Sequence, residues 1–100
     1  MCLEASLSSV PLIRFTNVRE LWLHQNNITL IERDSFVTLS ELEILEVHDN
    51  NVRRIELGAF NGLTGLRNLE IFDNWISEIL PGTFENMRNL ERLDLHYNRL

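Results

Sequence analysis

Several residue types that support particular functions are scarce or missing in this chain of 100 residues. Lysine is absent, so the nine basic residues are all arginine, and 15 acidic residues give a net charge of −6. Such a balance repels phosphate, and it predicts that neither nucleic acid nor an anionic membrane is a partner. No apolar run approaches the length that spans a bilayer, so we expect no membrane contact within this chain.

The sequence also lacks the residues that common catalytic and metal sites need. The single cysteine, Cys2, cannot form a disulfide within the chain, and structural zinc sites of the thiolate type usually need four ligands. There are only four glycines and no glycine-rich phosphate loop. No nucleophile is paired with a base, so the sequence predicts neither an enzyme nor a cofactor.

A repeat of 24 residues runs through most of the chain. Before each repeat's asparagine, aliphatic residues alternate with polar ones, as in Leu21–Leu23, which is typical of a half-buried strand. A short strand that returns at this interval predicts a solenoid with parallel strands. At the corner after each strand, the asparagine amide would hydrogen-bond backbone groups of the neighbouring turn. These structural asparagines are Asn26, Asn50, Asn74 and Asn98.

The repeat resembles the leucine-rich repeat family in its 24-residue form, which is common in extracellular proteins. The motif LxxLxLxxNxIxxIxxxxFxxLxx matches residues 18–41, 42–65 and 66–89, and its first half matches residues 90–100. The resemblance implies an α/β fold, namely a right-handed solenoid with a curved parallel sheet on its concave face. Turns or short helices would form the convex face, where a phenylalanine from each repeat would be buried. These are Phe36, Phe60 and Phe84.

Residues 1–17 depart from the repeat, and they resemble the end of the cysteine-rich cap that precedes many extracellular leucine-rich repeats. Cys2 and the LxxVP sequence at Leu7–Pro11 carry this resemblance, which implies a disulfide from Cys2 to a cysteine further upstream. The alternative is a buried free thiol. Because residues 90–100 hold only half a repeat, we expect the chain to be a fragment of a longer repeat protein.

We expect the polar residues of each strand on the concave face, since successive side chains point to opposite sides. In the five rows that face or flank this side, eight acidic residues against three basic ones leave a charge of −5. The acidic ones are Glu20, Glu43, Glu46, Asp49, Glu70, Asp73, Glu91 and Asp94, and the basic ones are Arg19, Arg67 and Arg92. Exposed aromatics among charges are typical of a protein-binding surface, although an ordinary solvated sheet is the alternative. The expected contact residues are Trp22, His24, Glu46, His48, Glu70, Phe72, Asp94 and His96.

The histidines allow three interpretations. His24 and His48 hold the same position on adjacent strands, where Cβ atoms lie about 5 Å apart. With Glu46 they would offer ligands to zinc, and without a metal they would make binding depend on pH. We favour the third interpretation, in which they are exposed histidines with no metal.

A sequon for N-glycosylation, Asn27-Ile28-Thr29, would carry its glycan on Asn27 at the outer corner of the first repeat. With the cap resemblance it favours an extracellular or cell-surface location. The resemblance implies a non-catalytic recognition module from a receptor, adhesion or guidance protein of the Slit-like, Toll-like or chaoptin-like kind. Its partner would be a protein ligand of basic character, bound on the concave face. The alternatives are a cytoplasmic leucine-rich repeat scaffold and a structural or carrier subunit of the extracellular matrix.

Overall fold

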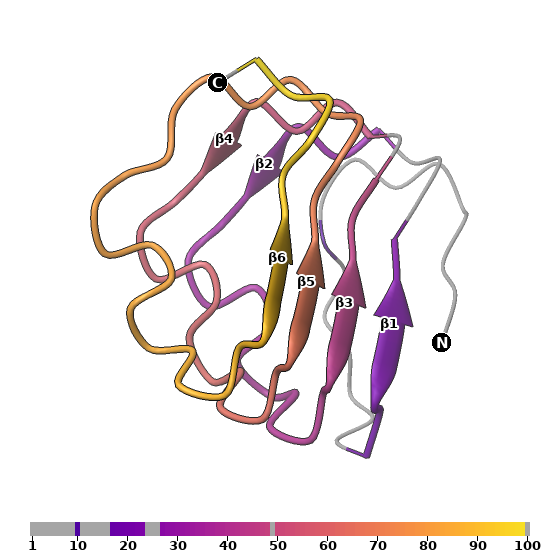
Figure 1. The fold of residues 1–100 in the computed structure, drawn as a ribbon, viewed down its shortest axis with the longest axis vertical. Coiled ribbons are helices and arrows are strands. Elements are labelled where there is room, and N and C mark those ends of the chain that lie inside the picture. The colour runs from indigo at the N-terminus through magenta and orange to yellow at the C-terminus, as the bar shows by residue number, and fades with distance from the viewer. Residues whose placement is uncertain (1–9, 11–16, 24–26, 49, 100) are drawn as a thin grey trace.

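The computed structural model describes residues 10, 17–23, 27–48 and 50–99. In these residues six short strands form two parallel sheets (Figure 1). The larger sheet has the order β1-β3-β5-β6, with β1 at Glu20–Trp22, β3 at Ile44–Glu46, β5 at Asn68–Glu70 and β6 at Arg92–Asp94. The smaller sheet pairs β2 (Leu30–Ile31) with β4 (Arg54–Ile55).

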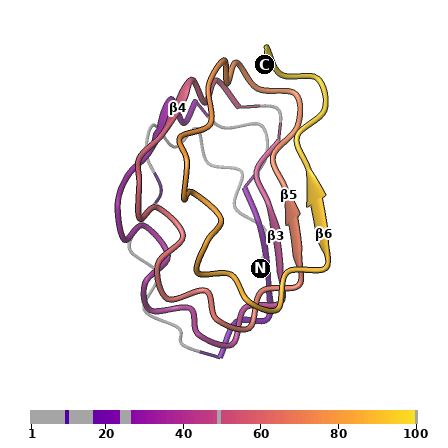
Figure 2. The same ribbon diagram turned by 60° about the vertical axis from the view of Figure 1, so that its left-hand side comes forward.

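The strands of the larger sheet pair in the register that the repeat predicts. Leu21 pairs with Leu45, Leu45 with Leu69, and Leu69 with Leu93. Each pairing joins residues 24 positions apart, so every repeat forms one turn of the coil. Seen from the side, the larger sheet forms one wall and β4 lies on the opposite wall (Figure 2). The predicted solenoid of parallel strands is therefore confirmed.

The core lies between the two walls. Leu21, Leu45 and Leu69 are fully buried, whereas Leu93 of the edge strand β6 is 41% exposed. The phenylalanines stack as a spine, with ring centroids 6.2 Å apart for Phe36 and Phe60 and 5.9 Å apart for Phe60 and Phe84. The first two rings are buried as expected, but Phe84 is only half-buried. Among the described residues the core is thus least complete at the end of the stack formed by β6.

The asparagine ladder bonds to the backbone as predicted. The side-chain Nδ2 of Asn74 donates to the carbonyl of Val47 at 2.8 Å and to that of Phe72 at 3.0 Å. Its Oδ1 accepts from the backbone N–H of Val52 at 3.2 Å. Asn50 and Asn98 make the matching bonds in their own repeats, and Asn26 lies outside the described residues. Each amide therefore ties its corner to the turn before it.

The convex wall consists of the expected turns together with one feature that was not expected. Its described residues contain turns and the small sheet but no helix, because hydrogen bonds there span three residues, as from the N–H of Val37 to the carbonyl of Asp34. The small sheet was not predicted, since strands of two residues are too short to show a period. The turns pass through positive φ at the same position of three successive repeats, with values of 60°, 84° and 83° at Asp34, Gly58 and Gly82, and the second repeat does so again at Gly62 with 89°.

Candidate protein-binding face

The concave face is the outer surface of the sheet β1-β3-β5-β6, and one row of side chains crosses its centre. Strand register brings Trp22 beside Glu46, Glu46 beside Glu70, and Glu70 beside Asp94. Neighbours in such a row lie about 4.8 Å apart. Trp22 is 37% exposed and Glu70 only 8% exposed. The fold therefore places four of the predicted contact residues in one line.

Glu46, at the centre of this row, has a raised pKa because it lies beside Glu70. The hydrogen bond to Glu70 is the main cause that raises the pKa of Glu46 to about 7. Burial and repulsion by the charges of Glu70 and Glu20 act in the same direction, and Arg92 opposes them. Two carboxylates side by side on neighbouring strands repel each other, so the protonated form of Glu46 is favoured to higher pH than usual.

At the β6 end of this row, Arg92 and His96 contact the carboxylates. One guanidinium nitrogen of Arg92 lies 3.6 Å from Glu70 and 3.7 Å from Asp94. The ring Nδ1 of His96 bonds to Asp94, and the backbone N–H of His96 donates to the same carboxylate at 3.1 Å. These hydrogen bonds hold the pKa of Asp94 below its ordinary value, although burial opposes them. Asp94 is therefore ionised at neutral pH.

A ladder of rings runs beside the acidic row. His48 and Phe72 stack with centroids 4.7 Å apart, and Phe72 and His96 stack at 4.8 Å, with the ring planes within 9° of parallel. Tyr97 continues the ladder through an edge contact with His96 at 4.4 Å. Three predicted contact residues thus form one connected surface.

The structure shows less about the other predicted site residues. His24, Cys2 and Asn26 lie outside the described residues, so the zinc interpretation of His24 with His48, which the sequence did not favour, stays untested. Across the part of the chain that the structure describes, no three His, Cys, Asp or Glu side chains are grouped to hold a metal ion. Asn27 is exposed, and its Oδ1 accepts a hydrogen bond from Asn51 at 3.4 Å.

Some residues of this region were not among the contact residues expected from the sequence. Arg92 and Tyr97 stood in the expected rows, but neither was chosen as a contact. At the corner beyond the ladder, Arg99 lies over the ring of Trp75, 4.1 Å from its centroid. The sequence signal for this corner was its aromatic residues, and the structure shows that they are exposed: Tyr97 to 72% and Trp75 to 44%.

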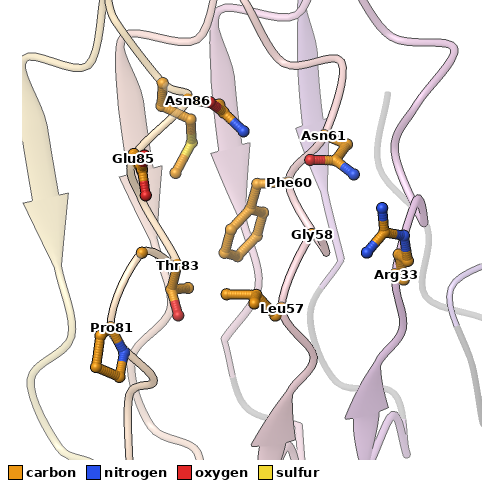
Figure 3. Close-up of a pocket in the computed structure, with 11 residues that line it drawn as sticks. Arg33, Leu57, Gly58, Phe60, Asn61, Pro81, Thr83, Glu85 and Asn86 are labelled. Atoms are coloured by element: carbon orange, nitrogen blue, oxygen red, sulfur yellow. The ribbon is translucent and has the colours of Figure 1, made fainter.

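A hollow lies on the convex side, and Figure 3 shows its lining. It measures about 250 Å³, and Leu57 and Phe60 line it together with Arg33 and Glu85. Its lining residues come from the turns of successive repeats, away from the acidic row. No helix in the described ranges is long and apolar enough to cross a membrane.

Two kinds of comparison with known proteins, one with family models and one with solved structures, give matches. The family model described as "Leucine rich repeat" matches residues 16–76. The crystal structure of a TLR13–ssRNA13 complex is similar with a TM-score of 0.83 and 32% sequence identity. That match covers 85% of this chain but 12% of the TLR13 chain, so the present sequence corresponds to a small part of that protein. The search of curated proteins found no match.

Proposed function

Because the chain belongs to the leucine-rich repeat family, we propose that it is a non-catalytic recognition module that binds a basic protein ligand on its concave face. The observation that carries this proposal is the row of Glu46, Glu70 and Asp94 beside a ladder of partly exposed rings. Carboxylates steer a basic partner and rings supply apolar contact area. The whole protein would be an extracellular or cell-surface receptor, adhesion or guidance protein.

The charge of the face argues against RNA as the ligand, although the TLR13 structure holds single-stranded RNA. Binding of RNA draws its affinity from basic side chains that neutralise phosphates. This chain has a net charge of −6 and no lysine, and its central row is acidic. A protein with exposed Arg or Lys side chains fits this surface better.

An unbiased selection tests the choice of ligand. We would pan a phage-displayed library of random dodecapeptides on the immobilised chain at pH 8 and low salt. We expect enrichment of basic peptides whose binding weakens with salt and perturbs NMR signals of β3, β5 and β6. No enrichment, or perturbation of the convex hollow at Leu57 and Phe60 alone, would contradict the proposal.

Variants locate the binding. The double variant Glu46→Lys/Glu70→Lys should weaken a selected basic peptide roughly tenfold or more, mainly through slower association. The matched control is Glu32→Lys/Glu78→Lys, which makes the same change of charge at two exposed residues outside the larger sheet. Since Glu70 is buried, Glu46→Gln/Glu70→Gln provides a milder pair of the same size. Equal affinity and equal salt dependence in all variants would count against the concave face.

The proposed location outside the cell depends on Asn27 and Cys2. The intact mass of the natural protein should exceed 11.8 kDa and should fall when N-glycans are removed enzymatically. Without reduction, Cys2 should resist alkylation, because we expect it in a disulfide. No glycan together with a freely alkylated Cys2 would favour the cytoplasmic scaffold instead.

A further inference from the structure

Tyr97 combines high exposure with an unfavourable backbone. At 72% it is the most exposed large hydrophobic side chain of the described residues. Its φ of 55° lies in the left-handed region, where a bulky residue is strained. Stability alone would favour Asn or Gly at this position. Strained residues of this kind gather at binding sites, so the position calls for a functional reason.

Its surroundings form an open hollow of about 490 Å³ between the third and fourth corners. Asp73 and Tyr97 hold the same position in successive repeats, and both line the hollow. Asp73 has the same left-handed backbone, with φ of 55°, and is exposed. Within the described part of the chain Asp73 makes no ion pair. The hollow thus offers a carboxylate beside an aromatic ring.

The same hollow already contains one contact between a cation and an aromatic ring. Arg99 lies over the ring of Trp75, 4.1 Å from its centroid, and both residues line the hollow. A cation over an aromatic face is attracted by the ring quadrupole. The ring of Trp75 is therefore already covered by a cation of this chain. Among the ring contacts of the described residues, the ring of Tyr97 has one, a T-shaped contact with His96.

We propose that Tyr97 and Asp73 form a subsite for one Lys or Arg side chain of the protein partner. The aliphatic stem of that side chain would lie along the ring of Tyr97, and its charge would meet the carboxylate of Asp73. The subsite continues the ring ladder of the concave face through His96, so one basic segment spans both. This inference rests on the proposed function, since it names a further contact of the same partner.

The test uses the tightest basic peptide from the selection on this chain. Tyr97→Asn removes the ring and suits the left-handed backbone, so we expect its Tm to stay or rise while Kd weakens about fivefold or more. Tyr97→Phe keeps the ring and should bind within about twofold of the parent. Leu57→Asn is the control, because it removes a 51% exposed apolar side chain on the convex side.

A second variant keeps the test independent of Tyr97. Asp73→Asn should weaken the same peptide about fivefold and reduce its salt dependence, without lowering Tm. Asp34→Asn is its matched control, because Asp34 has a left-handed φ of 60° on the convex side. Binding within twofold for both Tyr97→Asn and Asp73→Asn overturns the subsite. If Glu46→Gln/Glu70→Gln still weakens binding in that case, the proposed function stands and only this inference fails.

Discussion

At the residue scale, the glutamate pair makes stability depend on pH. The pKa of Glu46 rises from 4.5 to about 7 in the folded chain, mainly through its hydrogen bond to Glu70. The folded state therefore holds more protons than the unfolded state between these pH values, and stability falls as pH rises through this window. We expect the free energy of unfolding to be about 1 kcal/mol lower at pH 8 than at pH 5.5, since solvent screens the partly exposed Glu46.

Urea unfolding at the two pH values measures this effect. Glu70→Gln removes one charge and keeps a hydrogen-bonding group, so it should raise stability at pH 8 and flatten the pH dependence. Glu78→Gln, at an exposed glutamate away from the larger sheet, is the control and should leave the slope unchanged. A parent chain that is equally stable at both pH values would show that the pKa of Glu46 is not raised by folding.

The contribution of the ladder asparagines to stability can also be tested one residue at a time. Asn74 is 6% exposed, and its amide satisfies the carbonyl of Val47 and the N–H of Val52. Asn74→Ala leaves these backbone groups unpaired, and we expect a loss of about 3 kcal/mol. Asn51→Ala is the control, since Asn51 is exposed and bonds to Asn27 at 3.4 Å; it should change stability by less than about 0.5 kcal/mol. Equal losses in urea unfolding would refute the structural role of the ladder.

At the scale of elements, the position of a strand in the stack decides what its leucine contributes. Leu69 of β5 is fully buried between β3 and β6, whereas Leu93 of β6 is 41% exposed. Leu69→Ala should therefore cost about 2–5 kcal/mol, and Leu93→Ala about 1 kcal/mol or less. Chemical denaturation of the two variants checks this order. A greater loss for Leu93→Ala would mean that the edge of the sheet is better packed than its exposure indicates.

The strands and turns also show how much of the fold can be predicted from the sequence. The period of 24 residues and the alternation around Leu45 predict the large sheet and its register, because burial on one side of a strand requires that alternation. The pair β2–β4 was missed, since Leu30–Ile31 and Arg54–Ile55 are too short to show alternation. The turns were only partly predicted, because hydrogen bonds over three residues leave no helical period.

The site was predicted at the level of rows but not of individual contacts. The rows follow from the repeat, so Glu46, Glu70 and Phe72 were expected on one face. The raised pKa of Glu46 depends on how its side chain meets that of Glu70 across the strands, which spacing alone does not give. The left-handed backbone of Tyr97 could not be predicted either, because tyrosine has no preference for that conformation.

At the scale of the whole molecule, charge of one sign opposes folding. The chain has a net charge of −6, and Glu20, Glu46, Glu70 and Asp94 lie close together on one sheet. Repulsion among them is screened by salt, since the Debye length falls from about 30 Å at 0.01 M to about 3 Å at 1 M. We expect Tm at pH 8 to rise by several degrees between 10 mM and 500 mM NaCl.

The cause of that rise can be assigned by comparing variants. Glu46→Gln/Glu70→Gln removes two charges at the centre of the concave face, so its Tm at low salt should be higher and its response to NaCl smaller. Glu32→Gln/Glu78→Gln changes the net charge equally but leaves the row intact, so most of the response should remain. Equal responses in both double variants would mean that net charge alone, and not its gathering on the proposed binding face, governs the effect. A binding surface that is destabilised by its own charge gains most when a basic partner covers it, so this salt response and the affinity for basic peptides should decrease together in the Glu46→Gln/Glu70→Gln variant.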